Sequence, residues 1–313
     1  MQPLVTIITV NYNQPQLTAE LLRSIRQLNY PNIEVIVVDN GSIANAAPYL
    51  QGLFPNVTYL RSEENLGFAG GNNIGIKQAK GDFLFLVNND TELPADVLNL
   101  LLPVFDRYPN AGVVCPMILF YPAKPENKAL IQFAGYTPIN PFTARNHTIG
   151  EFEPDTGQYT QPAYTPYAHG AAMLVKKEVI QKAGLMPEMY FLYYEELDWS
   201  EQIKNAGFTI LVEPRATVYH KESMSVGKQS PLKTHYLTRN RILFMRRHAS
   251  VFHFWIFMAF FALFTLPKNL LLFMVRQQWT HLSAFWQAVC WHLQHNTGKS
   301  TPYNPVTLKQ PAV

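Results

Sequence analysis

The stretch that decides the fold reads VTIITVNYN at residues 5–13, a β-branched run followed directly by polar residues. Apolar residues then recur at helical spacing between 17 and 28, which predicts a helix after the strand. The alternation continues with predicted strands at 33–38, 57–60 and 83–87 and with a glycine-started helix that includes 74–80. Strands that are apolar throughout and alternate with helices are typical of a mostly parallel sheet covered on both faces. The sequence therefore predicts a doubly wound α/β fold.

Polar residues follow three of these strands at the points where the strands end. They are Asn11 and Asn13, the run Asp39-Asn40-Gly41-Ser42 and the run Asn88-Asn89-Asp90. Ligands of doubly wound sheets bind beyond the carboxyl ends of the strands. Asp39 can accept hydrogen bonds from a nucleobase imide or a ribose hydroxyl there, but it would equally form a turn and cap a helix with Ser42. Asp90 can bind a divalent cation that also contacts a diphosphate, or simply serve as a turn residue.

A glycine-rich segment runs from Glu64 to Asn73 and includes Asn65 and Gly67. It has neither the spacing of the dinucleotide fingerprint nor the Lys-Ser/Thr ending of a P-loop, which argues against a dehydrogenase or an ATPase. The glycines would let the backbone approach a ligand closely before the next helix. A purely structural tight connection explains them equally well.

Three carboxylates occur within four residues, as Glu195, Glu196 and Asp198, beside Tyr193, Tyr194 and Trp199. Acidic residues at the start of a helix complement the helix dipole, which is one explanation. Crowding carboxylates beside aromatic rings also raises the pKa of at least one of them, as a general base requires. We favour the catalytic interpretation.

Two basic groups complete the set of candidate site residues. His220 follows a predicted strand, and it would coordinate the same cation as Asp90 if the fold brings the two together. Arg239 begins a basic helix and could hold diphosphate oxygens with its forked donors. A structural histidine and a solvated helix face are the competing explanations.

Composition excludes several other classes of protein. A formal charge of +3 over 313 residues is too small for an electrostatic grip on nucleic acid, so no nucleic acid partner is expected. Cys115 and Cys290 are the two cysteines and lack metal-binding spacing, so neither a disulfide framework nor a zinc site is predicted. The first ten residues lack the features of a secretory signal, and we expect the main body in the cytosol.

The predicted organisation is a catalytic domain at 1–230, basic and apolar helices at 231–298 and a proline-containing disordered tail at 299–313. The uncharged run at 254–266 is shorter than the ~20 residues that span a bilayer, and Pro267-Lys268-Asn269 is expected to interrupt the apolar stretch. With basic residues before it, this stretch is expected to lie in the membrane interface. A helical hairpin that covers protein and a single tilted span over 251–275 are the alternatives.

Taken together, these motifs resemble family 2 glycosyltransferases of the GT-A fold, especially bacterial enzymes of O-antigen and cell-surface polysaccharide synthesis, including rhamnosyltransferases. The resemblance covers about residues 4–247 and rests on four ordered strings, at 5–13, 37–42, 64–72 and 194–198. It implies that Asp39 contacts the base, that Asp90 ends a metal motif for Mn²⁺ or Mg²⁺ completed by His220, and that Glu196 is the base, supported by Glu195 and Asp198. The metal motif here begins with Asn88 where the stricter pattern has an acid. The donor-binding residues implied are Asn11, Asn13, Asp39, Asn65, Gly67, Asn73, Asn88, Asn89 and Arg239.

The resemblance also implies partners and a location. An inverting transferase of hexosyl or deoxyhexosyl groups would use a nucleotide diphosphate sugar and a glycan or lipid-linked acceptor, at the cytoplasmic face of the inner (plasma) membrane, as a peripheral or monotopic protein. Oligomerisation stays open. A sugar nucleotidyltransferase is the alternative enzyme, although the glycine-rich basic signature expected after its first strand is missing at 11–15. An inactive nucleotide-sugar-binding scaffold is the alternative without catalysis.

Overall fold

The computed structural model describes residues 2–121, 129–221 and 230–295 and divides into two compact units. The sheet unit comprises Met1–Pro138, Asn146–Pro187 and Glu196–Ser225, and the helical unit comprises Ile139–Arg145, Glu188–Glu195 and Val226–Val313. Two short segments that precede residue 230 thus belong with the C-terminal helices. The tail predicted at 299–313 lies outside the described residues.

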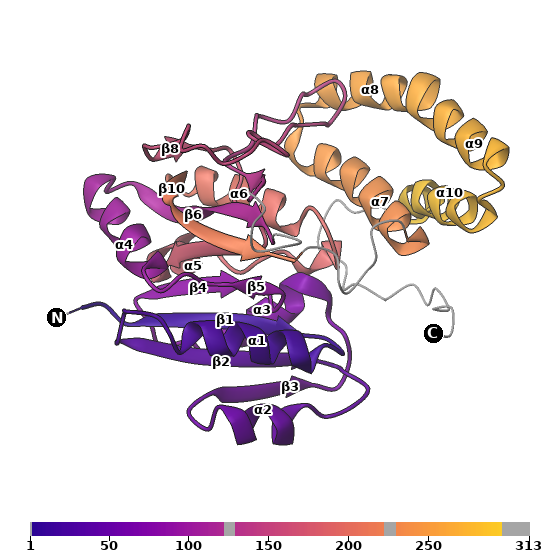
Figure 1. Ribbon diagram of the computed structural model, residues 1–313. Helices are drawn as coiled ribbons and strands as arrows, with labels where there is room; N and C mark the ends of the chain where they lie inside the picture. The colour runs from indigo at the N-terminus through magenta and orange to yellow at the C-terminus, as the bar shows by residue number, and fades with distance from the viewer. Residues whose placement is uncertain (1, 122–128, 222–229, 296–313) are drawn as a thin grey trace. The chain divides into compact units, whose positions relative to one another are not determined.

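One ten-stranded sheet organises the sheet unit, in the order β3-β2-β1-β4-β9-β6-β10-β5, with β7 paired to β6 and β8 paired to β10 (Figure 1). Strands β1 to β4 are mutually parallel, whereas β9 runs antiparallel to both β4 and β6. The predicted mostly parallel sheet is therefore found in the first half, and the second half is mixed. The strands are β1 Val5–Asn11, β2 Ile33–Asn40, β3 Thr58–Ser62, β4 Phe83–Val87, β5 Thr91–Glu92, β6 Ala111–Phe120, β7 Ile131–Phe133, β8 Ala163–Tyr164, β9 Ala172–Lys176 and β10 Thr209–His220.

Helices cover the sheet because its central strands are apolar on both faces. Leu84 to Val87 of β4 are at most 3% exposed, as expected for a strand between two layers. Helix α3 packs on β1 and β2, and α4 packs on β6 and β10. The helices of this unit are α1 Pro15–Ile25, α2 Ala47–Leu53, α3 Gly67–Gln78, α4 Val97–Arg107, α5 Lys177–Ala183 and α6 Glu195–Asn205, the last beginning one residue before the unit boundary.

The glycines of α3 allow this helix to lie close to the strands. A Cβ at Gly75 would stand 2.4 Å from Cγ2 of Ile8, and one at Gly71 would stand 2.8 Å from Cγ1 of Val10. Both contacts are shorter than carbon atoms tolerate. The structural explanation of the glycine-rich segment therefore holds for these two positions.

Gly75→Ala is expected to destabilise the protein by about 1–3 kcal/mol, because the added methyl overpacks the contact with Ile8. Thermal unfolding measures the effect. Gly52→Ala is the matched control, since Gly52 lies in α2 with nothing within 4 Å of an added Cβ. There the substitution should stabilise by about 0.5–1 kcal/mol, as alanine does in helices. Equal shifts at the two positions would contradict the packing argument.

The helical unit contains the 3-10 turn η1 Glu188–Tyr190 and the helices α7 Pro231–His248, α8 Val251–Phe260, α9 Leu266–Val275 and α10 Trp279–Gln294. A π-helical turn, η2 Phe261–Thr265, joins α8 to α9, so that 251–275 is one continuous helix (Figure 1). The expectation that Pro267 interrupts this stretch is wrong. Proline lacks an N–H and its ring clashes with the carbonyl four residues earlier in a regular helix, and the wider turn before Pro267 accommodates both effects. Asn269 Nδ2 donates to the carbonyl oxygen of Thr265 at 2.7 Å, which further stabilises this turn.

The helix Val251–Val275 has 25 residues and a mean hydropathy of 1.8, enough by length and composition to cross a membrane. The uncharged run 254–266 is too short to span a bilayer, but the helix that contains it is long enough.

Candidate functional site

Asp39 lies at the carboxyl end of β2 and is fully buried. Its Oδ1 accepts hydrogen bonds from Asn11 Nδ2 at 3.3 Å and from the backbone N–H of Ser42 at 3.3 Å. Its Oδ2 accepts from Tyr59 Oη at 2.8 Å and pairs with Arg61 Nη1 at 3.2 Å. Burial and the hydrogen bond to Asp39 raise the pKa of Tyr59 well above its ordinary value, so this hydroxyl stays a donor. Asp39 therefore organises the strand ends around it, and Tyr59 and Arg61 are partners that sequence reasoning missed.

A chain of hydrogen bonds runs from Asp39 along the sheet edge to the end of β4. Asn11 donates to Asp39 and accepts from Thr18 Oγ1 at 3.0 Å, and Thr18 Oγ1 accepts from Asn89 Nδ2 at 3.2 Å. The structure thus brings together the polar ends of β1, β2 and β4, as the parallel pairing of these strands requires.

Asn13 and Asn88 hold the backbone around this edge. Asn13 adopts a left-handed conformation with φ 56°, and its Oδ1 accepts from the N–H of Ile43 at 2.8 Å. The N–H of Asn88 donates to the carbonyl oxygen of Ala171 at 2.9 Å, which ties the end of β4 to the segment before β9. Both residues lie at the predicted edge and shape its loops.

Asp90 and His220 meet because β5, which follows Asp90 directly, pairs with the end of β10 through Thr91 and His220. His220 Nε2 lies 3.2 Å from Asp90 Oδ1, and both residues are 7% exposed. On the other side of the ring, Nδ1 lies 2.8 Å from Gln132 Oε1. The predicted pairing of Asp90 with His220 is therefore present in the structure.

This donor set fits a divalent cation. Gln132 Oε1 can only accept, so Nδ1 of His220 is the donor in this contact and Nε2 faces the Asp90 carboxylate. Either a proton on Nε2 or a cation bound by both atoms satisfies this contact. A separation of 3.2 Å suits two neighbouring ligands of one cation with bonds of roughly 2.1 Å. Among the described residues, no cluster of three or more His, Cys, Asp or Glu side chains is suited to a metal.

An aromatic cluster extends from His220 toward helix α6. The rings of Phe133, Tyr136 and His169 lie with centroids 4.8 to 6.0 Å apart; Tyr136 and His169 are stacked, and Phe133 is tilted against both. The His169 ring lies 6.4 Å from the His220 ring. Sequence reasoning missed these residues, because Phe133 and Tyr136 come from an irregular stretch without periodicity. The only signal in the sequence was a histidine, His169, directly before Gly170.

The charge of Glu196 reaches this cluster. Burial raises the pKa of Tyr136 well above its ordinary value, and the negative charge of Glu196 raises the pKa further. Burial, together with the neighbouring His220, lowers the pKa of His169 to about 3, so this ring is neutral. Its Nδ1 accepts from the N–H of Ala171 at 3.1 Å, which leaves the proton on Nε2. The charge of Glu196 therefore acts on the aromatic cluster, and this cluster in turn contacts His220, the partner of Asp90.

The other two acids of the cluster are more buried than Glu196. Asp198 is fully buried and accepts from Gln202 Nε2 at 2.6 Å, whereas Glu195 is 3% exposed. Glu196 is half-buried, and its carbonyl oxygen accepts from Ser200 Oγ at 2.6 Å within α6. Among the three, Glu196 has the side chain that solvent and substrate reach most easily.

The remaining donor-site candidates hold the loop before α3. Asn40 Nδ2 donates to Asn65 Oδ1 at 3.0 Å and to the carbonyl oxygen of Gly67 at 2.9 Å. Gly67 starts α3 with φ 73°, a conformation that favours glycine. Asn73 is 1% exposed and pairs with both backbone groups of Met186, at 2.8 and 3.1 Å. Asn65, Gly67 and Asn73 therefore order the backbone beside the sheet edge.

Arg239 lies inside the helical unit with a fully buried side chain. Its Nη2 donates to the carbonyl oxygens of Met189 at 2.9 Å and Tyr190 at 2.7 Å. Its guanidinium also stacks 4.8 Å from the ring of Tyr236 and 5.0 Å from that of Trp291. In this conformation Arg239 holds the loop before α6 and does not face solvent.

The loop that Arg239 holds is strained. Phe191, Tyr193 and Tyr194 have φ values of 64°, 68° and 76°, in the left-handed region that bulky residues avoid. Asn240 Nδ2 donates to the carbonyl oxygens of Tyr190, Leu192 and Tyr193 at 3.0, 2.8 and 2.7 Å. Such strain persists only where surrounding contacts fix it, and it is common at functional sites. The loop leads directly into Glu195 and Glu196.

Comparison with known proteins identifies the kind of enzyme. The model of glycosyl transferase family 2 matches residues 6–184. The N-acetylglucosaminyl-diphospho-decaprenol L-rhamnosyltransferase of Mycobacterium tuberculosis is 25% identical over 250 residues, which cover 73% of this chain and 79% of that protein. The low-salt glycan biosynthesis hexosyltransferase Agl10 of Haloferax volcanii is 24% identical over 215 residues, covering 66% and 63%.

A solved structure shares the fold. The mannosyltransferase PcManGT of Pyrobaculum calidifontis, in complex with GDP-Man and Mn²⁺, superposes with a TM-score of 0.57 and 18% identity and covers 95% of this chain and 88% of that one. The order of elements is that of the GT-A glycosyltransferases. Because the family match extends over more than half of the 313 residues, the chain belongs to glycosyltransferase family 2 and is a glycosyltransferase with the GT-A fold.

Proposed function

We propose that this enzyme moves a hexosyl or deoxyhexosyl group from a nucleoside diphosphate sugar to an acceptor hydroxyl, with inversion at the anomeric carbon. One observation carries the proposal: a single sheet unit joins Asp39 through hydrogen bonds to the end of β4, where Asp90 meets His220, and Glu196 is in electrostatic reach of the adjoining aromatic cluster. A base, a leaving-group site and a nucleoside site are what this reaction needs.

In this proposal Asp39 accepts hydrogen bonds from the base or ribose, within loops ordered by Asn11, Asn13, Asn65, Gly67, Asn73, Asn88 and Asn89. Glu196 accepts the proton of the acceptor hydroxyl while that oxygen attacks the anomeric carbon and the bond to the diphosphate breaks. A single displacement of this kind inverts the anomeric centre. Asp198 and Glu195, both buried in the first turn of α6, support this base.

Asp90 and His220 would hold a Mn²⁺ or Mg²⁺ ion. When bound, such an ion stabilises the negative charge that develops on the departing diphosphate. The contact of Gln132 Oε1 with Nδ1 would orient the His220 ring so that Nε2 could bind the ion. The Mn²⁺ in the mannosyltransferase complex supports a cation in this fold.

The acceptor that we propose is a lipid-linked or polysaccharide glycan of the cell envelope, reached from the cytoplasmic face of the membrane. The decaprenol-linked acceptor named for the mycobacterial relative supports this class. The free cysteines Cys115 and Cys290 suit a reducing compartment. The apolar helix Val251–Val275 supports a membrane location.

Incubation with individual nucleoside diphosphate sugars and Mn²⁺ tests the proposal. Release of nucleoside diphosphate, together with a glycosylated acceptor of inverted anomeric configuration, is the expected result. Pyrophosphate release would instead identify a nucleotidyltransferase. Binding of the sugar nucleotide without any release would identify a scaffold.

Asn240→Ala is expected to lower kcat by about 10- to 100-fold with little change in KM for the donor. It removes the three hydrogen bonds that fix the strained loop before Glu196, and a small misplacement of a catalytic group has effects of this size. Thr238→Ala, on the same helix, is the control and should leave kcat unchanged. An unaltered kcat in Asn240→Ala would show that the loop keeps its place without this clamp.

A further inference from the structure

The surface of the helical unit combines positive charge with exposed apolar side chains. Residues 231–294 contain seven Lys and Arg residues and no Asp or Glu. Along the helix Val251–Val275, six large apolar residues are between 60% and 73% exposed: Phe252, Trp255, Leu263, Phe264, Leu271 and Val275. Only 17% of the most apolar window of this helix is buried. A helix that is apolar all round and so little covered needs an apolar partner.

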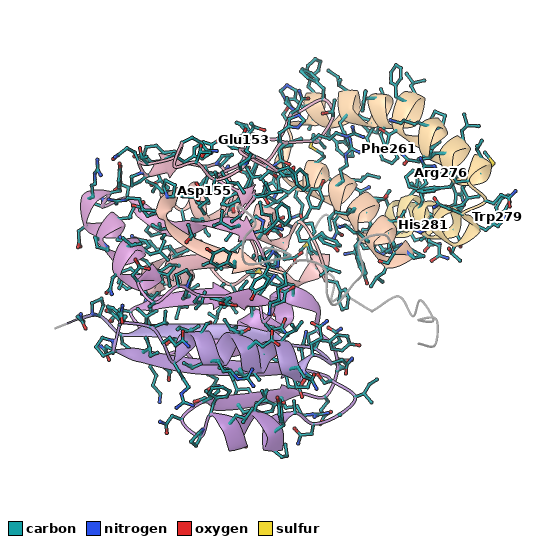
Figure 2. The ribbon with its side chains drawn as sticks, viewed as in Figure 1. Glu153, Asp155, Phe261, Arg276, Trp279 and His281 are labelled. Carbon is teal, nitrogen blue, oxygen red and sulfur yellow. The ribbon has the colours of Figure 1, made fainter. Side chains whose placement is uncertain are left out.

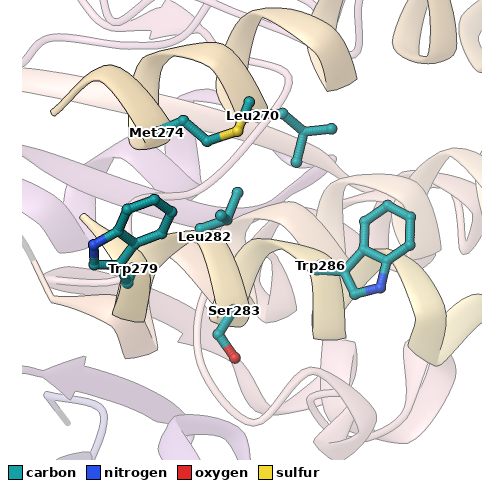
Figure 3. A pocket seen from close by; sticks show the side chains of 6 residues that line it. All are labelled: Leu270, Met274, Trp279, Leu282, Ser283 and Trp286. Atoms are coloured by element: carbon teal, nitrogen blue, oxygen red, sulfur yellow. The ribbon is translucent and has the colours of Figure 1, made fainter. Parts of the chain in front are cut away.

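A shallow groove continues this apolar surface. It lies between α9 and α10, has a volume of about 370 Å³ and is lined by Leu270, Met274, Trp279, Leu282, Ser283 and Trp286 (Figure 3). Ser283 is the only polar residue of the lining. Trp279 and Trp286 are 60% and 52% exposed, so the groove opens to the surroundings.

The order of the helices decides how the long apolar helix can meet a membrane. Helices α7 and α10 run side by side in the same direction, because Thr234, His235 and Arg239 of α7 bond in turn to residues of α10. The partners are His281 at 2.8 Å, the carbonyl oxygen of Ala284 at 3.2 Å and His292 at 2.8 Å. The helix 251–275 starts at the end of α7 and returns to the start of α10 (Figure 1). Stacking of Phe273 on His281, with centroids 5.6 Å apart, keeps its far end beside the start of α7.

Helix α7 therefore extends from one end of the apolar helix to the other. At 1.5 Å per residue α7 is about 27 Å long and 251–275 about 37 Å long. If 251–275 crossed the bilayer, α7 would be drawn through the hydrocarbon with Lys233, Arg239, Arg241, Arg246 and Arg247. Charged side chains at that depth are costly. This geometry argues against a simple span.

We propose that the helical unit seats the helix 251–275 lengthwise in one leaflet of an anionic membrane, as an in-plane anchor. The groove between α9 and α10 then receives lipid chains of the same leaflet. Arg276 and Trp279, at the turn between these helices (Figure 2), lie at the depth of the headgroups, where tryptophan and basic side chains are favoured. A second copy of the chain is the less suitable occupant, because its residues 231–294 would add further Lys and Arg and no acid that could pair with them.

A depth measurement distinguishes the in-plane anchor from a span. Nitroxide labels are placed singly at Phe252, Leu263 and Val275, in the full chain with Cys115→Ala and Cys290→Ala, and bound to vesicles of phosphatidylcholine and phosphatidylglycerol. The in-plane anchor predicts equal depths at all three positions, about 5–10 Å below the headgroups. A spanning helix predicts Leu263 near the centre, about 15 Å deep, with both end labels shallow. The second profile would overturn the proposal.

A sedimentation experiment tests the same proposal with both cysteines in place. Leu263→Asp is expected to lower binding to the anionic vesicles at least 10-fold, and vesicles of phosphatidylcholine alone should bind the unchanged chain at least 10-fold more weakly. Ile43→Asp is the control, because Ile43 is 92% exposed but lies in the sheet unit. Equal binding of the two variants, or binding indifferent to phosphatidylglycerol, would refute the anchor. Neither label depth nor vesicle binding depends on glycosyl transfer. A negative result would therefore refute the membrane anchor without bearing on the proposed reaction.

Discussion

Replacing Glu196 by glutamine is expected to lower kcat by about 10²–10⁴-fold and to leave the Kd of the donor unchanged, because a positioned base contributes that much and an amide cannot accept the proton. The substitution keeps the size of the side chain and removes only its basicity. Steady-state turnover with saturating donor and acceptor measures the loss. Donor binding is measured separately by the rise in Tm with added sugar nucleotide, which follows mass action.

Glu201→Gln provides the matched control for this experiment. Glu201 lies on the same helix, is partly exposed and pairs with Lys204 at 3.0 Å, an exposed contact of the kind that contributes little. Turnover should be retained in this variant. Near-normal turnover in Glu196→Gln would remove Glu196 from the mechanism, and equal losses in both variants would point to a structural defect of α6.

The first half of the sheet and its polar edge could be predicted because the information is local. Residues 5–10 form a strand by their β-branched pattern, and parallel strands align their carboxyl ends by geometry. Asp39 and Asn11 therefore meet at one edge, and Asp90 lies in contact with His220. The position of β9 between β4 and β6 and its antiparallel direction were not predicted, because strand order depends on contacts distant in sequence.

The rest of the site depends on contacts that no periodicity encodes. Tyr136 comes from an irregular segment and reaches His169 only through the fold. Arg239 shows a different limit. We expected it to begin a basic helix and to meet phosphate or solvent, but it lies in the middle of α7, where its guanidinium donates to two backbone carbonyl oxygens and packs on two aromatic rings. Pro267 normally signals an end to a helix, but the π-helical turn before it absorbs the disturbance. The environment of Tyr136 and Arg239 is formed by residues distant in sequence, and the turn before Pro267 is a local distortion that residue patterns do not indicate.

Asp90→Asn is expected to lower kcat/KM at least about 100-fold and to abolish the effect of Mn²⁺ on donor binding, because an amide is a much weaker ligand and a bound cation contributes several kcal/mol of charge stabilisation. Titration of Mn²⁺ against initial rate and against donor-dependent Tm measures both effects. Loss of rate with an unchanged Mn²⁺ dependence would show that Asp90 has another role.

Gln132→Leu is expected to weaken the cation site without destroying it. It leaves Asp90 and His220 in place but removes the acceptor that holds the His220 tautomer, 2.8 Å from Nδ1. Groups of this kind change metal affinity by about 10–100-fold, so the Mn²⁺ concentration for half-maximal rate should rise by that factor while the rate at saturating Mn²⁺ recovers. A simple packing defect would instead lower Tm and the saturated rate together. Added Mn²⁺ should restore the rate of Gln132→Leu but not that of Asp90→Asn, because excess cation compensates for a weakened site but not for a missing direct ligand. This combination would assign the cation to the pair formed by Asp90 and His220.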